Sequence, residues 1–396
     1  MSGAPDGFCG FCESQIASES KTTETKVRRG LHITMPIMKN IRKKKTGILL
    51  CILCALLMTA CGANGSPENT QDTASSDGGT SDTSDQDMIV VGFSQVGAES
   101  DWRKENTQSM IKAFSAERGY ELILEDAQQK QSNQITAIRT FIQRDVDYIV
   151  LAPVTEEGWD TVLGEAKDAG IPVIIVDRKV ATQDEGLFTC WIGSDFELEG
   201  KKVCTWLTDF CSKKGITPDS LNIVDIQGTI GSSAQIGRTK GLVDAAAKNG
   251  WNISGMASGE YTQAKGREVT AGFLNRFPDV NVVYCENDNE AFGAIEAIEA
   301  AGKKAGSDIA GGEIMVLSFD GVSEEAINDA REGKISCIGE CNPLHGPRVE
   351  KIIRNLQQGT APDKYIYVEE ELFSADQSIT SVEVEGNGYP VTIIGQ

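Results

Sequence analysis

The chain has 396 residues, a length that exceeds one small core and fits two domains with a tail. Hydrophobic residues make up 40% of it, which is typical of a globular α/β protein and excludes a polytopic membrane protein. The formal net charge of -21 argues against a nucleic-acid partner, because phosphate binding needs a basic surface.

The N-terminal region has the pattern of a targeting signal. A basic cluster within residues 39–45 precedes an apolar run at 47–60, which ends at Cys61. This order predicts a secretory signal peptide, because the run is shorter than the roughly 20 residues that a membrane-spanning helix needs. The run Leu57-Met58-Thr59-Ala60-Cys61 resembles the lipobox of bacterial lipoproteins, although Met58 stands where that family usually has leucine. The resemblance implies that Cys61 is lipidated and becomes the mature N-terminus.

The residues on either side of this signal are not expected to fold. Met38 adjoins the basic cluster, where a signal peptide begins, so we predict that residues 1–37 are a non-native or disordered lead. Residues 38–60 are then the signal peptide. Residues 61–87 comprise Cys61 and a flexible tether, because 62–87 has almost no apolar side chains. The predicted location is extracytoplasmic, with a lipid anchor in the cell membrane.

From Met88 onward, continuous apolar runs alternate with segments of helical apolar spacing. The first half predicts strands at 89–93, 121–124, 148–151 and 172–176, and helices at 102–118, 135–142 and 159–169. The second half predicts strands at 221–226, 280–284 and 314–319, and helices at 235–248 and 290–301. Uninterrupted apolar strands separated by helices are typical of parallel sheets covered on both faces. The expected fold is therefore α/β, with two similar doubly wound parallel-sheet domains.

Polar side chains gather where these strands end. Asp177 and Asp320 each fall just past a strand, at the edge of a parallel sheet where ligands bind. Taken singly, each such residue also fits a solvated loop charge or a helix cap. Taken together, they suit a sugar, because carboxylates and guanidinium groups bond hydroxyls and aromatic faces cover C–H groups. The candidates by position are Glu99, Trp102, Arg103, Asp177, Arg178, Asn287, Asp288, Asp320 and Glu340.

Six of the eleven cysteines lie beyond Met88, too few for a disulfide scaffold in a chain of this length. One or two disulfides remain open, and the sequence does not assign them. The CxxC spacings at Cys9–Cys12 and Cys51–Cys54 lack a second pair or a histidine cluster, so no zinc site is expected. No loop has EF-hand spacing, and no metal or cofactor is predicted.

Several motifs resemble one protein family. They are Val91-Gly92-Phe93-Ser94-Gln95-Val96-Gly97, Glu99-Ser100-Asp101-Trp102-Arg103, Gln128-Gln129-Lys130-Gln131, Ala152-Pro153-Val154 and Glu340-Cys341-Asn342-Pro343-Leu344. From Met88 to the end, the chain is similar to type I periplasmic binding proteins of the ribose/galactose group, and especially to the galactofuranose-binding subgroup. Ala152 departs from the ribose binders, which carry asparagine there.

The resemblance implies two lobes that close on a ligand about a hinge. The N-terminal lobe would comprise 88–191 and 341–373, and the C-terminal lobe 192–340 and 374–396. Three crossings are expected near 190–193, 339–342 and 373–376.

The resemblance also implies roles for individual residues. Asp177 and Arg178 would bind ring hydroxyls, Trp102 and Arg103 would line the first wall, and Tyr261 would contribute from the second. The last crossover would supply Glu340 or Asn342. The full expected ligand-binding set is Glu99, Trp102, Arg103, Asp177, Arg178, Arg238, Asn287, Asp320, Glu340 and Asn342.

The implied function is that of a sugar-binding lipoprotein of an ABC importer, with a monosaccharide, a permease and its ATPase as partners and a monomeric state. An enzyme is not expected and no catalytic residue is assigned. The one histidine past Met88, His345, is interpreted as a surface residue at a helix start. The alternative is a receptor of the same fold that presents sugar to a sensor kinase or chemoreceptor. Neighbouring permease genes would favour transport, and a histidine kinase gene would favour sensing.

Overall fold

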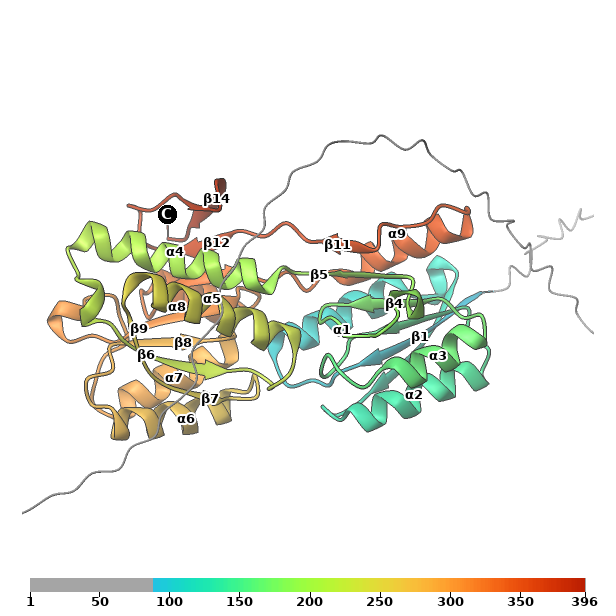
Figure 1. The fold of residues 1–396 in the computed structure, drawn as a ribbon, viewed down its shortest axis with the longest axis horizontal. Coiled ribbons are helices and arrows are strands. Elements are labelled where there is room, and N and C mark those ends of the chain that lie inside the picture. The colour runs from blue at the N-terminus through green and yellow to red at the C-terminus, as the bar shows by residue number, and fades with distance from the viewer. Residues whose placement is uncertain (1–87, 396) are drawn as a thin grey trace, which may run out of the picture. The chain divides into compact units, whose positions relative to one another are not determined.

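The computed structural model describes residues 88–395. The predicted lead, signal peptide, Cys61 and tether lie outside this range. Within it, two sheets each form the centre of a lobe (Figure 1). Among the described residues, no helix combines the length and the apolar character that crossing a membrane requires.

The first sheet has six parallel strands in the order β11-β5-β4-β3-β1-β2. Its strands are β1 (Ile89–Gln95), β2 (Tyr120–Asp126), β3 (Tyr148–Leu151), β4 (Val173–Val176), β5 (Cys190–Gly193) and β11 (Tyr365–Tyr367). Its helices are α1 (Asp101–Ala113), α2 (Gln131–Gln143), α3 (Asp160–Asp168) and α9 (His345–Gln357). Apolar residues of α1 and α9 pack on one face of the sheet, and those of α2 and α3 pack on the other.

The second sheet has eight strands in the order β13-β14-β12-β10-β9-β8-β6-β7. They are β6 (Asn222–Gln227), β7 (Asn252–Ser258), β8 (Val282–Cys285), β9 (Met315–Asp320), β10 (Ile335–Glu340), β12 (Leu372–Ser374), β13 (Ser381–Val384) and β14 (Asn387–Ile393). Helices α4 (Phe196–Lys214) and α5 (Ser233–Asn249) cover one face. Helices α6 (Gln263–Arg276), α7 (Asp288–Ala300) and α8 (Glu324–Arg331) cover the other.

The two doubly covered sheets confirm the predicted fold class. Strands β6 to β10 are parallel, while β12 runs antiparallel to β10 and extends the second sheet with β13 and β14. This extension was not predicted, because its short strands alternate buried and exposed residues instead of forming apolar runs. The helix predicted at 102–118 ends at Ala113 and is followed by a 3-10 turn at Ala116–Arg118.

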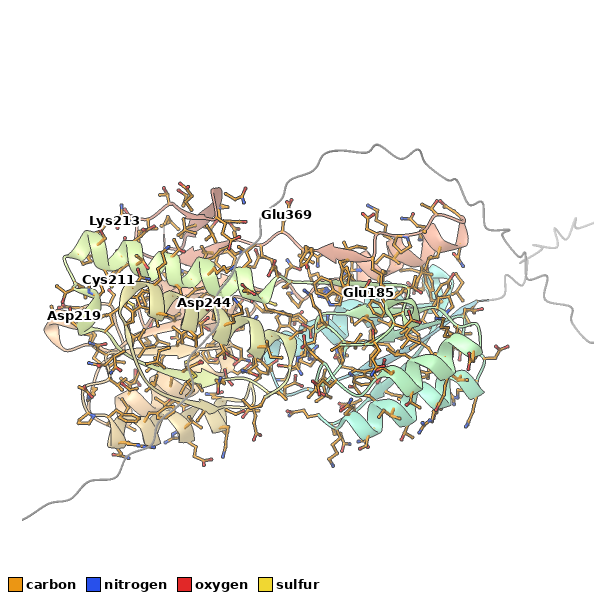
Figure 2. All side chains as sticks on the ribbon, viewed as in Figure 1. Glu185, Cys211, Lys213, Asp219, Asp244 and Glu369 are labelled. Carbon is orange, nitrogen blue, oxygen red and sulfur yellow. The ribbon has the colours of Figure 1, made fainter. Side chains whose placement is uncertain are left out.

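The chain passes between the sheets three times. It leaves β5 at Gly193 and begins α4 at Phe196, leaves β10 at Glu340 and begins α9 at His345, and leaves β11 at Tyr367 and begins β12 at Leu372. Figure 2 labels Glu369 on this last segment. The sequence-based boundaries at 191/192 and 373/374 fall inside β5 and β12, whose residues each belong to a single sheet.

Candidate functional site

A pocket lies where the strand ends of the two lobes face each other. The side chains of its wall leave a cavity of about 20 Å³, room for about one water molecule, so a larger ligand requires the two walls to move apart. Residues of both lobes contribute to its wall, so the pocket exists only when the lobes are together. Its lining residues are Glu99, Ser100, Trp102, Arg103, Asp177, Arg178, Phe196, Ala234, Arg238, Tyr261, Asn287, Asp320 and Cys341.

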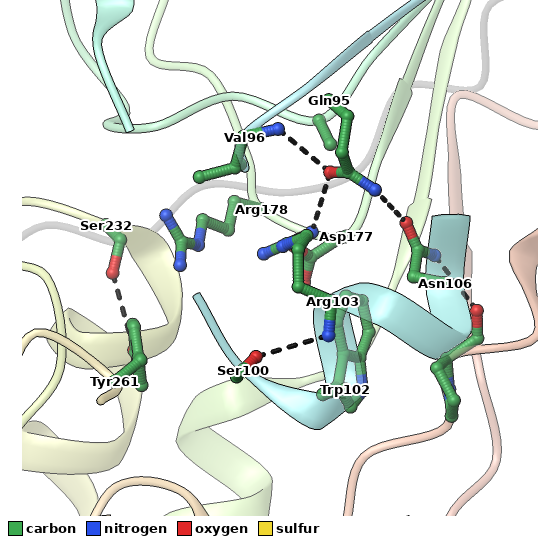
Figure 3. Close-up of polar contacts among 12 residues, drawn as sticks. Gln95, Val96, Ser100, Trp102, Arg103, Asn106, Asp177, Arg178, Ser232 and Tyr261 are labelled. Atoms are coloured by element: carbon green, nitrogen blue, oxygen red, sulfur yellow. Dashed lines mark hydrogen bonds and ion pairs between the residues drawn. The ribbon is translucent and has the colours of Figure 1, made fainter. Parts of the chain in front are cut away.

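The first-lobe wall is organised around Arg103 of α1 (Figure 3). Its Nη2 lies 2.8 Å from Asp177 Oδ2, its Nε donates to Glu99 Oε1 at 3.1 Å, and its Nη1 donates to Gln95 Oε1 at 3.3 Å. Burial lowers the pKa of Arg103, but the carboxylates of Asp177 and Glu99 outweigh it and raise the pKa above its ordinary value. Arg103 is therefore a fixed positive charge that orients two carboxylates towards the pocket.

A second group of hydrogen bonds holds this wall from behind. Gln95 Nε2 donates to Asn106 Oδ1 at 2.9 Å, and Asn106 Nδ2 donates to the Pro343 carbonyl at 2.9 Å. Trp102 Nε1 donates to the Cys341 carbonyl at 2.8 Å. The first-lobe wall is thus tied to the second crossing, whose residues include Cys341 and Pro343.

The second-lobe wall is organised around Arg238 of α5. Its Nε donates to Glu199 Oε2 at 2.8 Å, and its Nη2 lies 3.5 Å from Asp320 Oδ1. Its Nη1 donates to the Glu286 carbonyl. Burial raises the pKa of Asp320 well above its usual range, and Asp288 and Glu199 raise it further, although Arg238 opposes them. Each lobe therefore presents one buried arginine beside one strand-end aspartate.

These two aspartates share an unusual backbone conformation. Asp177 has φ 63° and Asp320 has φ 103°, the left-handed region that side chains other than glycine seldom adopt. Asp177 is held by its N–H, which donates to the Ile192 carbonyl at 2.9 Å, and by its carbonyl, which accepts Trp191 Nε1 at 3.0 Å. The Asp320 carbonyl accepts the Cys341 N–H at 3.1 Å. Strained backbone of this kind concentrates at ligand-binding sites.

Arg178 and Tyr261 face each other from opposite lobes. Arg178 Nη1 donates to the Val154 carbonyl at 2.9 Å. The guanidinium group held in this way lies over the Tyr261 ring. Tyr261 follows β7 with φ 60° and lies against Gly228, where an added Cβ would come within 1.8 Å of Tyr261 Cζ. Glycine at position 228 is thus required for this placement of the ring.

The wall offers both halves of a hydroxyl-binding site. Glu99 Oε2 is buried and receives no hydrogen bond from any residue in the range 88–395. An unpaired buried carboxylate oxygen is costly unless a ligand donor reaches it. The guanidinium groups supply donors, and Trp102, Phe196 and Tyr261 supply apolar faces.

Eight of the ten predicted ligand-binding residues line this pocket. Glu340 and Asn342 do not. Glu340 Oε1 accepts Asn342 Nδ2 at 3.2 Å and its Oε2 accepts the Glu371 N–H at 3.0 Å, while Asn342 Oδ1 accepts Arg348 Nη1 at 3.0 Å. Both side chains support the crossing segments instead. Their neighbour Cys341 lines the pocket.

The structure also gives the surroundings of His345 and Asp288, two residues considered in the sequence analysis. His345 is the first residue of α9, as expected, but the prediction of a surface position was wrong, since it is fully buried beside Trp102. Burial lowers its pKa to about 4, which keeps the ring neutral at ordinary pH. Asp288 faces away from the pocket, with Oδ1 accepting Ser318 Oγ at 2.6 Å and Oδ2 accepting the Gly321 N–H at 2.8 Å.

Four residues line the pocket without having been predicted to do so: Ser100, Phe196, Ala234 and Cys341. Phe196 and Ala234 are apolar residues in the first turns of α4 and α5. Their place in the pocket follows from the orientation of the two helices, which a local sequence pattern does not give. All six cysteines in the described range are unpaired and buried, so no disulfide forms there.

One group of side chains within residues 88–395 brings metal-ligand atoms together. Ligand atoms of Glu199, Cys341 and Glu370 lie within 4.8 Å of one another. Arg238 already pairs with Glu199, and Lys202 Nζ donates to the Glu370 carbonyl at 2.8 Å. The Glu370 carboxylate itself accepts Ser194 Oγ at 2.7 Å and the Asn342 N–H at 2.7 Å. Because both carboxylates already have partners, we assign no metal there.

Known proteins are similar to this chain in sequence and in fold. Residues 91–338 match the family described as periplasmic binding protein domain. The galactofuranose-binding protein YtfQ of Escherichia coli is 38% identical over 308 residues, which cover 76% of this chain and 93% of that protein. A Mycobacterium smegmatis structure in complex with β-D-fucofuranose is 39% identical, with a TM-score of 0.68 over 72% of this chain and 91% of that one. The arabinose ABC transporter binding protein of Shewanella sp. ANA-3, bound to L-arabinofuranose, is 38% identical, with a TM-score of 0.66 over the same shares.

These relatives are binding proteins and not enzymes, which confirms the prediction made for this chain. The matched region spans β1 to β10 and includes both strand-end aspartates. The chain is therefore a member of the periplasmic binding protein family, type I.

Proposed function

We propose that this protein captures a monosaccharide in its furanose form between its two lobes and delivers it to an ABC permease outside the cytoplasm. The observation that carries the proposal is the pocket itself. It joins a buried arginine–aspartate pair from each lobe to aromatic faces in one interlobe site.

The chemistry of the wall supports a small polyhydroxylated ligand. Carboxylates accept from hydroxyls, guanidinium groups donate to ring and hydroxyl oxygens, and aromatic rings cover C–H faces. The relatives with 36–39% identity are described with galactofuranose, fucofuranose and arabinofuranose, which are all five-membered rings. A furanose sugar is therefore the ligand class we infer here.

Release to a permease requires the pocket to open. Three crossing segments link the lobes, which is the arrangement that supports hinge motion. A sugar enclosed by residues of both lobes can enter and leave only when the lobes separate. Other relatives are named as fructose and ribose import binding proteins, and the Shewanella protein as a component of an arabinose ABC transporter, which supports the same role for this chain.

We also propose that Cys61 is lipidated and tethers a monomer to the outer face of the cell membrane. The lipobox-like run before Cys61 supports this proposal. Mass spectrometry of the protein purified from bacterial membranes should find acyl chains on an N-terminal Cys61. A Cys61→Ser chain should appear unacylated in the soluble fraction. Acyl-free wild-type protein would contradict the anchor, and analytical ultracentrifugation tests the monomer.

The ligand proposal is tested by thermal unfolding against galactofuranose, fucofuranose, arabinose, ribose and inositol. A ligand that binds only the folded state raises the melting temperature by mass action. We expect a shift with furanose-forming sugars that Asp177→Ala removes. Asp219→Ala, at an exposed aspartate on the second lobe (Figure 2), is the matched control and should keep the shift. No shift with any sugar, in protein shown to be ligand-free, would refute the proposal.

A further inference from the structure

The lobes touch each other directly at points outside the pocket. Asn289 of α7 meets Asp101, the first residue of α1, in a reciprocal pair. Asn289 Oδ1 accepts the Asp101 N–H at 2.9 Å, and Asn289 Nδ2 donates to Asp101 Oδ2 at 3.4 Å. Neither residue lines the pocket, although Ser100 and Trp102 on either side of Asp101 do.

A second contact lies beside Arg178, on another part of the rim. The N–H of Lys179 in the first lobe donates to Ser233 Oγ in the second at 2.8 Å. Close by, the Glu156 N–H donates to the Gly231 carbonyl at 3.0 Å. Lys179 follows the lining residue Arg178, and Ser233 precedes the lining residue Ala234.

From these contacts we infer that Asp101–Asn289 and Lys179–Ser233 are latches that set how tightly the lobes close, independently of which sugar is bound. The inference rests on the proposed sugar binding for its affinity readout. Each contact joins the two lobes, so it breaks when they separate and re-forms when they close. Any ligand gains affinity from contacts that favour the closed state, and contacts outside the pocket do so equally for every sugar.

The Asp101–Asn289 pair allows a charge-swap test. Asn289→Asp places a second carboxylate beside Asp101 and removes the only side-chain donor of the pair, so it should open the latch. The new carboxylate would stand in the first turn of α7, where the helix dipole favours negative charge, so the fold should be preserved. Adding Asp101→Asn exchanges the two side chains: the amide at position 101 can then donate to the carboxylate at position 289.

The measurement uses the full chain with one dye on each lobe, and follows energy transfer with and without sugar. We expect Asn289→Asp to lower the closed fraction and to raise Kd by about 10-fold, as expected for the loss of the hydrogen bond from Asn289 Nδ2 plus repulsion between the two carboxylates. The double variant should return Kd to within about 3-fold of wild type. The ratio of Kd values for two sugars should stay the same in all variants.

The controls separate a latch from a general weakening of the structure. Asn249→Ala removes amide contacts within the second lobe only, to Ala245 and Thr208, and should leave closure unchanged. Ser233→Ala removes the acceptor of the second latch and should raise Kd by about 3-fold, the value of one hydrogen bond.

An unchanged Kd in Asn289→Asp, or a double variant as weak as the single one, would overturn the inference. A changed ratio between sugars would also overturn it, because the residues would then act on specificity. If wild type binds no sugar, the proposed function fails, and the closed fraction measured without sugar still decides whether the latches exist.

Discussion

The guanidinium carbon of Arg178, in the first lobe, lies 5.1 Å from the ring centre of Tyr261, in the second. Both side chains are buried and both line the pocket. The contact joins a residue expected to bind sugar to the opposite wall, so closing the lobes and completing the site are the same event. A cation over an aromatic face is strongest when water is excluded, as it is here.

Replacing the Tyr261 ring should therefore weaken binding more than removing its hydroxyl. We expect Tyr261→Ala to raise Kd roughly 10-fold or more, which corresponds to the loss of a desolvated cation–π contact. Tyr261→Phe keeps the ring and loses only the 3.4 Å contact with Ser232 Oγ, so about a 2- to 3-fold change is expected. Titration calorimetry measures both. Equal effects of the two substitutions would show that the hydroxyl matters and the ring does not.

Gly228 should be essential to the same feature without touching the sugar itself. A Cβ at Gly228 would overlap the Tyr261 ring, so Gly228→Ala must displace the ring from the pocket. We expect Kd to rise about as much as in Tyr261→Ala, roughly 10-fold. The matched control is Gly272→Ala on α6, where an added Cβ has open space around it. That change should leave Kd unaltered and stabilise the helix by about 0.5–1 kcal/mol.

The fold and half of the site followed from simple patterns. Asp177 and Asp320 were predicted from position alone, because they end apolar runs that read as parallel strands. Arg238 was predicted only from the family resemblance, because the residue pattern of α5 does not distinguish it from an ordinary helix arginine. Tyr261 follows β7, a strand whose few apolar residues gave no strand signal. The left-handed turn that aims its ring inward is set by tertiary packing against Gly228.

The positions of Glu340 and Asn342 outside the pocket lining have a physical cause. A residue at a strand end was expected to face the cleft, but the chain turns into a crossing segment at this point. There the Glu340 carboxylate is used by the Glu371 N–H and by Asn342. Local sequence does not reveal how a crossing segment turns, so side-chain direction at this strand end could not be predicted.

This difference can be tested with paired carboxylate-to-amide substitutions. Asp320→Asn replaces a carboxyl oxygen of the pocket by an amide group that cannot accept from a sugar hydroxyl, and it weakens the contact with Arg238 Nη2, so we expect Kd to rise roughly 100-fold. Glu340→Gln keeps one oxygen, which can still accept the Glu371 N–H, loses the acceptor for Asn342 Nδ2, and should change Kd by less than about 3-fold because both contacts lie outside the pocket. Binding measured by calorimetry distinguishes them. A large effect of Glu340→Gln would place this residue back among the ligand contacts.

A buried carboxyl group behind the pocket should make stability depend on pH. Asp288 is 3% exposed, and burial raises its pKa to about 7, although hydrogen bonds from Ser318 and Gly321 oppose the rise. In the unfolded chain the same group titrates near its ordinary value of 3.8. The folded state therefore holds a proton that the unfolded state loses. Its contribution to stability is complete below about pH 4 and is lost as the pH rises to about 7.

Urea unfolding of the purified protein from pH 4.5 to 8 measures this effect. We expect the free energy of unfolding to fall with rising pH, with Asp288 contributing on the order of 2–4 kcal/mol. In Asp288→Asn the side chain stays neutral, and its amide can still offer oxygen to Gly321 and N–H to Ser318, so the pH dependence should flatten. A slope should remain from other buried carboxyl groups, because burial raises the pKa of Glu286 to about 8 and that of Glu370 to about 9. Asp219→Asn, at an exposed site, should keep the wild-type slope. An unchanged slope in Asp288→Asn would mean that Asp288 is already ionised in the folded protein, and that its hydrogen bonds outweigh its burial.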